Sequence, residues 1–492
     1  MAQVLADSVI GYPQSLAIFS KPVQNCGVRQ TKHIKYLPTN DYSTQGVIQF
    51  TVSGAGSKYL DLSKTILNLR VKIVEGDGKP LPKFTGKRSV SGSKTESRDS
   101  KADDDNEDNV DAEEERSDDL RKSTEATIKQ DTFNTSVMTG VTNNFLHSMF
   151  SRVDVHLQNR LMTDSDGCYA YQAYFKTKLG TPADIKSGAL QMQMFYDEGN
   201  PEYSTDCDWI ATNYKGLKTR SSFFTGSQEV DLCGRLCSDI FDIDRLIPNG
   251  VPLQITLYPN LPQFCLLSPQ ILPPPDFKFV ITQASLEVCF VTVAPEIVAA
   301  HSEILASEPA LYPMTKTEVK KFAIAQGLFG AEINNPFEGR VPAEMVIGIV
   351  DGAASHGRYN SDPFYFEHCS LNYLQATCDG EDLSNSPMAV KFGETAMESQ
   401  FIDGYKSLMG VGGFPGIVPM DRVSYFSGNT LFRFVREQED SQSGDIMPLK
   451  RTGNVRLSLK FDKALTDPKT IIVFASFPSG FRIDKNRSVQ DL

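Results

Sequence analysis

Hydrophobic and polar residues alternate with a period of two in several stretches of the chain. In residues 62–74, Leu67, Leu69, Val71 and Ile73 fall on one face, and polar residues occupy the other. The same alternation recurs in residues 251–258, VPLQITLY, and in residues 455–461, VRLSLKF. This period is typical of a β-strand with one buried face, so each stretch predicts a strand of an antiparallel sheet.

Further strand and helix signals fill the chain. Strands are predicted at residues 47–52, 230–241, 277–293, 320–325, 345–350, 371–378, 431–436 and 471–477. The apolar phase of residues 277–293 slips near Gln283, which indicates a bulge or bend. Residues 169–179 and 401–409 space their apolar side chains at helical intervals and predict two short helices.

A buried corner and a strand are predicted in residues 141–162. An apolar patch that includes Phe145 and Phe150 leads into an alternating segment containing Val155. Asn159-Arg160 follows, where a tight reversal is expected, and Asp379-Gly380 ends residues 371–378 in the same way, 220 positions later. The alternating stretches that begin at residues 251 and 455 are 204 positions apart, against 220 for the two turns. The same order of strand and turn signals therefore occurs twice, with loops of different length.

The repeat predicts an all-β chain of two tandem eight-stranded antiparallel jelly-rolls with short helices and long loops. We expect an N-terminal arm at residues 1–45, a first jelly-roll at 46–295, a linker at 296–313 and a second jelly-roll at 314–492. At 492 residues, the chain is long enough for two such cores.

An acidic segment interrupts the first jelly-roll. Residues 96–125 hold 14 acidic and 5 basic residues, a net charge of -9 out of -12 for the whole chain, which leaves about -3 for the remainder. Because residues 75–130 have little apolar surface to bury, they are interpreted as a disordered surface loop, with a domain linker as the alternative. The rest of the chain has no basic stripe, so direct nucleic-acid binding through phosphate neutralisation is not expected.

Nine cysteines at irregular spacings indicate reduced thiols in a protein made in the cytosol or nucleus. The N-terminal residues lack the basic region of a signal peptide, and no run of about 18 apolar residues is present to span a membrane.

No motif of known chemistry stands out. A nucleophile elbow, a P-loop and a zinc H-E-x-x-H are absent, and the glycine-rich residues 410–416 lack dinucleotide-binding spacing. His368-Cys369 and the pair Cys233 and Cys237 come nearest to metal-ligand pairs, and they are interpreted as buried thiols and a loop histidine. We therefore predict no catalytic, cofactor-binding or metal-binding residue, no cofactor and no enzymatic activity. A carboxylate pair acting on glycans stays open, because its geometry is spatial.

Several segments in combination resemble a known family. Residues 143–159, NNFLHSMFSRVDVHLQN, are the most distinctive, and they are accompanied by residues 59–73, 234–241, 249–257, 345–352, 362–374, 453–461 and 481–489. Together they resemble the double jelly-roll, hexon-like major capsid proteins of adintoviruses and the Maverick/Polinton elements. The acidic segment and the proline-rich residues 269–276 depart from the family pattern.

The resemblance implies a structural capsid protein whose homotrimers form pseudo-hexagonal capsomers and tile an icosahedral shell around double-stranded DNA. Its implied partners are further copies of itself and the penton and minor capsid proteins, without membrane insertion or sequence-specific nucleic-acid binding. It implies synthesis in the host cytoplasm, assembly in the host nucleus and residence in the virion. Two alternatives stay open: a host-retained or cellular jelly-roll binding module, and a β-sandwich enzyme acting on glycans.

Overall fold

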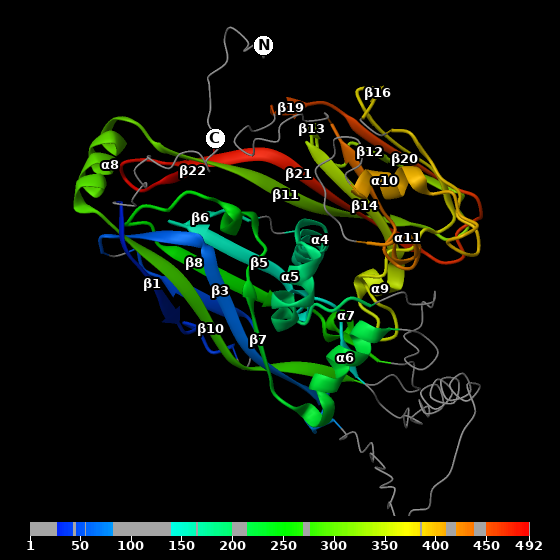
Figure 1. Cartoon of the computed structure of the whole chain (residues 1–492), viewed down its shortest axis with the longest axis horizontal. Coiled ribbons are helices and arrows are strands. Elements are labelled where there is room, and N and C mark those ends of the chain that lie inside the picture. The colour runs from blue at the N-terminus through cyan, green and yellow to red at the C-terminus, as the bar shows by residue number, and fades with distance from the viewer. Residues whose placement is uncertain are drawn as a thin grey trace, which may run out of the picture.

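The computed structural model describes residues 27–42, 46–54, 56–81, 139–163, 166–198, 214–268, 276–383, 386–409, 420–436 and 449–491. Within these residues the chain forms two β-sandwiches that follow one another along the sequence (Figure 1).

The first sandwich has two four-stranded antiparallel sheets. One sheet has the order β1 (Val28–Tyr36), β10 (Phe277–Val293), β3 (Lys58–Glu75) and β7 (Val230–Arg235). The other has the order β2 (Ile48–Val52), β8 (Leu253–Pro259), β5 (Phe150–Leu157) and β6 (Arg160–Leu161).

The second sandwich repeats this arrangement. Its first sheet has the order β11 (Ala310–Ile324), β21 (Lys469–Ile483), β14 (Glu344–Asp351) and β18 (Leu431–Val435). Its second has the order β12 (Gly330–Asn334), β20 (Val455–Phe461), β15 (Leu371–Cys378) and β16 (Glu381–Asp382). If the eight strands of either sandwich are numbered along the chain, both sandwiches have the orders 1-8-3-6 and 2-7-4-5. The predicted pair of tandem eight-stranded jelly-rolls is confirmed.

Short elements complete the described part. The additional strands are β4 (Gly140–Val141), β9 (Leu266–Leu267), β13 (Arg340–Val341), β17 (Met388–Ala389), β19 (Arg451–Thr452) and β22 (Val489–Asp491). The α-helices are α3 (Phe145–Ser148), α4 (Tyr169–Gly180), α5 (Ala183–Ser187), α6 (Lys215–Phe223), α7 (Pro262–Cys265), α8 (Pro295–Ser307), α9 (Gly352–His356), α10 (Ile402–Met409) and α11 (Arg422–Phe426). Three 3-10 helices are η2 (Ala189–Gln193), η3 (Thr225–Ser227) and η4 (Asp239–Asp242).

The predicted strand phases agree with the burial of the side chains. Leu67, Val71 and Ile73 of β3 have no exposed surface, and the same holds for Ile255 and Leu257 of β8. The expected irregularity in β10 is a shift of register between Ile281 and Gln283, opposite β3. Alternation with one wet face therefore correctly predicts which residues of these strands face the core.

Matching hairpins close the corresponding strands of the two sandwiches. Gln158 and Asn159 join β5 to β6 with φ of 56° and 87°, and Asp379 and Gly380 join β15 to β16 with φ of 52° and 91°. Two consecutive residues with positive φ are typical of a type I′ turn, whose twist suits a two-residue hairpin. The predicted reversal at Asn159-Arg160 is wrong by one residue, because Arg160 already pairs with Leu157 in β6.

Three boundaries also need correction. Residues 28–36 of the predicted arm form β1, which pairs with β10 at the edge of a sheet. This strand is exposed along most of its length, so it has no apolar alternation to reveal it. In residues 230–241 the strand ends at Arg235 and η4 follows. Residues 297–305 of the predicted linker have their apolar side chains at helical spacing, and they form part of α8 as this spacing predicts, but β11 begins at Ala310, four residues before the expected start of the second jelly-roll.

The acidic insertion lies mostly outside the described residues. The hairpin after β3 pairs Val74 with Pro80, and the description stops at Leu81 and resumes at Thr139. Residues 1–26, the glycine-rich residues 410–416 and the proline-rich residues 269–275 likewise lie outside it.

Candidate functional site

The two sandwiches meet around α4, which lies between them in Figure 1. Tyr174 of α4 stacks on Phe364 of the second sandwich, with ring centroids 4.4 Å apart. The neighbouring Phe175 lies 5.3 Å from Phe366 and 5.4 Å from Phe474, again between ring centroids. A buried aromatic contact of this size makes the helix part of both cores.

Polar contacts cross the same boundary. The carboxylate of Asp239, in η4, accepts hydrogen bonds from the backbone N–H and the hydroxyl of Thr317, in β11, both at 2.7 Å. Lys320 of β11 pairs with Asp166 at 2.7 Å. These contacts tie β11 to the first sandwich along one side, so the two jelly-rolls are held in a defined orientation rather than joined only by α8.

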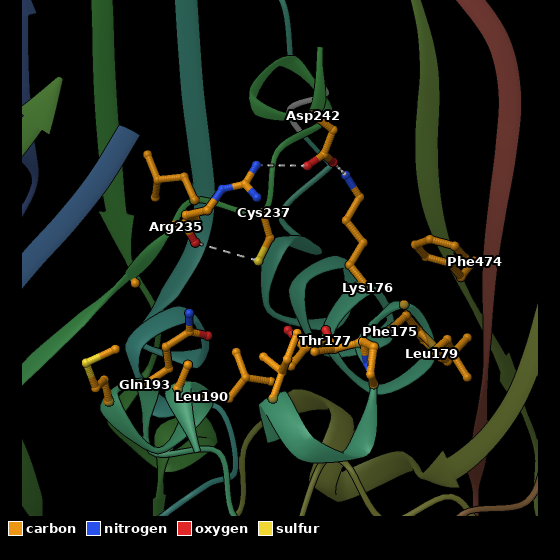
Figure 2. A pocket seen from close by; sticks show the side chains of 18 of the residues that line it. Phe175, Lys176, Thr177, Leu179, Leu190, Gln193, Arg235, Cys237, Asp242 and Phe474 are labelled. Atoms are coloured by element: carbon orange, nitrogen blue, oxygen red, sulfur yellow. Dashed lines mark hydrogen bonds and ion pairs between the residues drawn. The ribbon is translucent and has the colours of Figure 1, made fainter. Parts of the chain in front are cut away.

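A recess of about 840 Å³ opens where α4, α5 and η2 approach the second sandwich (Figure 2). Its apolar lining includes Phe175, Leu179, Leu190 and Phe474. Ile185 and Met192 also line it, with 43% and 53% of their surface exposed. The recess has the size of a ligand site, so its polar groups decide what chemistry it can support.

The charged groups of the recess neutralise one another. Lys176 lies 2.7 Å from Asp242, and Arg235 approaches Asp242 from the other side at 3.6 Å (Figure 2). Lys176 also lies 2.6 Å from Asp239. Burial alone would lower the pKa of Lys176, but the two carboxylates outweigh it and the pKa is raised. Lys176 therefore stays protonated and is not a candidate general base.

Cys237 and His147 form the nearest approach to a nucleophile and its base. The sulfur lies 3.7 Å from Nε2 of His147, whose Nδ1 lies 3.0 Å from the hydroxyl of Tyr169. Burial lowers the pKa of His147 to about 4 and raises the pKa of Cys237 to about 11. Both groups are neutral near pH 7, whereas a cysteine nucleophile needs a thiolate stabilised by its surroundings.

The other residues singled out from the sequence do not assemble into a site. Cys233 and Cys237 line the same recess, but His368 lies in the second sandwich, stacked on Phe392 at 4.6 Å. Cys369 contacts Glu367, with 3.6 Å between sulfur and oxygen. Among the residues described by the structure, no three histidine, cysteine or acidic side chains are grouped so that they could hold a metal ion. In the same part of the chain, no helix has the length and apolar character needed to cross a membrane.

The strand order and the joint aromatic core define the chain as a double jelly-roll protein. No family model matches it. An uncharacterized protein of Caenorhabditis elegans is 26% identical over 358 residues, which cover 70% of this chain and 80% of the relative.

Several solved structures of viral proteins have the same fold. A chain of the Sputnik virophage has a TM-score of 0.56 and 13% identity, covering 100% of this chain and 94% of its own. The mavirus major capsid protein has a TM-score of 0.51 and 10% identity, with coverage of 100% and 97%. The Faustovirus major capsid protein has a TM-score of 0.52 and 11% identity, with coverage of 96% and 92%. At these identities the likeness establishes the fold alone.

Proposed function

We propose that this chain is a major capsid protein that forms homotrimeric capsomers. The observation that carries the proposal is the repetition of one strand order in two sandwiches, in a chain that aligns from end to end with viral major capsid proteins. Three copies would bring six similar sandwiches around a threefold axis. Six such units give a nearly hexagonal outline, which is the shape required to tile the facets of an icosahedral shell.

The surface of the described residues supports an assembly role. Leu328 and Phe329, in the connection between β11 and β12, are adjacent apolar side chains with 46% and 62% of their surface exposed. When a partner covers large apolar side chains in an exposed loop, their surface leaves water and the free energy of the complex is lowered. We assign this pair to a contact between copies of the chain. Penton and minor capsid proteins are the further partners proposed.

A role without catalysis fits the chemistry of the large recess. Its Lys176 is paired with Asp239 and Asp242, and Cys237 on its wall and the neighbouring His147 are both neutral near pH 7. We propose that the side chains around the recess and at the aromatic interface hold the two jelly-rolls in one orientation. We also propose that the shell encloses double-stranded DNA without sequence-specific contacts from this chain.

The proposed source is a virus or element of the adintovirus and Maverick/Polinton group, with assembly in the host nucleus. The resemblance of residues 143–159 supports this assignment. A relative in a nematode fits a capsid gene that resides in an animal genome, and it also supports a second candidate function, a host-retained jelly-roll module. Assembly of capsomers into shells with their viral partners would support the capsid function over the host-retained module.

Light scattering on the purified full-length chain tests the proposal. We expect the mass of three chains at micromolar concentration, and we expect Phe329→Asp to weaken the trimer at least tenfold. Gln326→Asp is the matched control, because it adds the same charge at an exposed polar position in the same connection. A wild-type chain that stays monomeric and forms no capsomers with its viral partners would exclude the proposed function.

A further inference from the structure

Helix α8 is unusual because none of its 13 residues is buried. It nevertheless carries Ile297, Val298, Ile304 and Leu305, and Ile304 has 58% of its surface exposed. Short helices have little stability in water unless an apolar face packs against something. Ile297 and Val298 pack against a buried cluster that includes Tyr59 and Val293, whereas Ile304 is left exposed. The last turns of α8 therefore present apolar surface that an additional segment can cover.

Beside α8 lies a recess of about 460 Å³. Its walls come from α8, from the ends of β1, β10 and β11, and from residues 245–248, and its apolar lining includes Leu246, Ile297 and Leu305. Two hydroxyl groups along these walls already have partners. The hydroxyl of Tyr59 lies 3.1 Å from Nδ1 of His301, and the hydroxyl of Tyr312 donates to the carbonyl of Leu246 at 2.9 Å. The recess therefore suits apolar side chains rather than a polar ligand.

The chain itself enters the described structure at this recess. Gly27 and Val28 line it, and the backbone N–H of Ala294, the residue before α8, donates to the carbonyl of Gly27 at 2.9 Å. The 26 residues that precede Gly27 include an apolar run, Leu16-Ala17-Ile18-Phe19, separated from Gly27 by seven residues. Seven extended residues reach roughly 24 Å, which is enough to reverse direction and return to the recess.

We infer that residues 16–19 of the same chain fold back into this recess and pack against α8. A segment tethered seven residues away has a high effective concentration at the recess, so it competes well against an apolar segment of another molecule. Its aromatic and branched side chains match the apolar walls in character, and they would cover the exposed side chains of α8. The inference does not depend on a capsid role.

Hydrogen–deuterium exchange on the full-length chain is the first test. We expect the amides of residues 297–306 to exchange at least tenfold faster in Phe19→Asp than in the wild-type chain. Ser20→Asp, which adds the same charge next to the apolar run, should leave their exchange within twofold of wild type. Equal exchange in all three proteins would overturn the inference. If the amides of α8 are protected from exchange only after vesicles of phosphatidylglycerol and phosphatidylcholine are added, the inference is overturned in favour of a membrane surface.

Photo-crosslinking identifies the occupant directly. With p-benzoylphenylalanine in place of Phe19, we expect crosslinks to peptides that contain residues 245–248 or 297–305 of the same chain. In a mixture of nitrogen-15-labelled and unlabelled chains, the mass of a crosslinked peptide pair shows whether its two peptides come from one chain or from two. Crosslinks between labelled and unlabelled chains would overturn the inference in favour of an arm exchanged between copies, and the absence of crosslinks to these peptides would also overturn it.

Discussion

Tyr174 and Phe364 stack face to face across the boundary between the two jelly-rolls, with ring centroids 4.4 Å apart and ring planes 4° apart. Tyr174 comes from α4, and Phe364 comes from the connection between β14 and β15. Tyr171 approaches the same Phe364 ring edge-on at 5.6 Å. The two sandwiches thus share one aromatic cluster, and we expect them to unfold as a single cooperative unit.

Phe364→Ala should lower the free energy of unfolding by about 3–5 kcal/mol, because it leaves a cavity in the shared cluster. Urea unfolding followed by circular dichroism measures the change. Phe223→Ala is the control, since Phe223 has 40% of its surface exposed, and it should cost less than about 1 kcal/mol. If the two substitutions cost the same, the aromatic cluster does not stabilise the boundary.

The phase of β8 can be tested with two charge substitutions in one strand. Leu257→Asp should abolish folding, because it buries an unpaired carboxylate at a cost of several kcal/mol on a face with no exposed surface. Gln254→Asp should be tolerated, since Gln254 is half-buried on the opposite face. Val155→Asp, on the partner strand opposite Ile255, should behave like Leu257→Asp. Soluble yield distinguishes them, and equal yields for the two β8 variants would contradict the assigned phase.

Sequence patterns predict the strands of the sheets better than they predict the contacts between the two sandwiches. Strands with one wet face, such as β3 and β8, carry a period of two that marks their buried residues. By contrast, β1 is an exposed edge strand without such a pattern, so its sequence predicts an arm and not a strand. The contact of Asp239 with Thr317 joins residues 78 positions apart through side chains of ordinary type. No local pattern indicates such a pairing, because it depends on how two complete sandwiches dock.

The position of Asp362 predicts a pH-dependent effect. Burial and the neighbouring carboxylate of Glu198 raise the pKa of Asp362 to about 6, against the opposing effects of the Phe364 backbone N–H and Arg220. Between its ordinary pKa of 3.8 and this value, the folded chain holds a proton that the unfolded chain releases. The stability contributed by this group is therefore full at low pH and is lost as the pH rises through about 6.

Asp362→Asn should accordingly raise the free energy of unfolding by about 1–3 kcal/mol at pH 8 and have little effect at pH 4. Urea unfolding of both proteins across this range measures the difference. His147 acts in the opposite direction, because burial lowers its pKa to about 4, but both proteins contain it and its effect cancels. Asp462→Asn, at an exposed position, is the control and should show no such dependence. If Asp362→Asn raises the free energy of unfolding equally at all pH values, ionisation of Asp362 does not account for the effect.

Cys237 should react slowly with iodoacetamide in the folded chain. Burial raises its pKa to about 11, so little thiolate is present at pH 8. Cys378 is half-buried like Cys237, and burial and Asp379 raise its pKa as well, but its thiol is less desolvated, so we expect Cys237 to be labelled more slowly than Cys378. Mass spectrometry of labelled peptides follows both sites, and in urea the two rates should converge. Faster labelling of Cys237 than of Cys378 would identify an activated thiol and favour an enzymatic role.

The end of β3, which precedes the acidic segment in the sequence, lies far from α8. Glu75, at the end of β3, pairs with Phe277, the first residue of β10, whereas the last residue of β10, Val293, lies next to α8. A strand of 17 residues at about 3.3 Å per residue separates the two by roughly 55 Å. Glu75 and α8 therefore lie at opposite ends of the first sandwich (Figure 1).

We predict that residues 96–125 face outward from the proposed shell and that the α8 end faces inward. A segment of charge -9 and packaged DNA would repel each other, and salt screens only the part of that repulsion beyond a Debye length of roughly 8–10 Å. An outward loop also lengthens at little entropic cost. Brief protease treatment of intact particles should cleave within residues 86–130 while the DNA stays protected. Resistance to cleavage until the shell is broken would place the segment inside, as a tether for an internal protein.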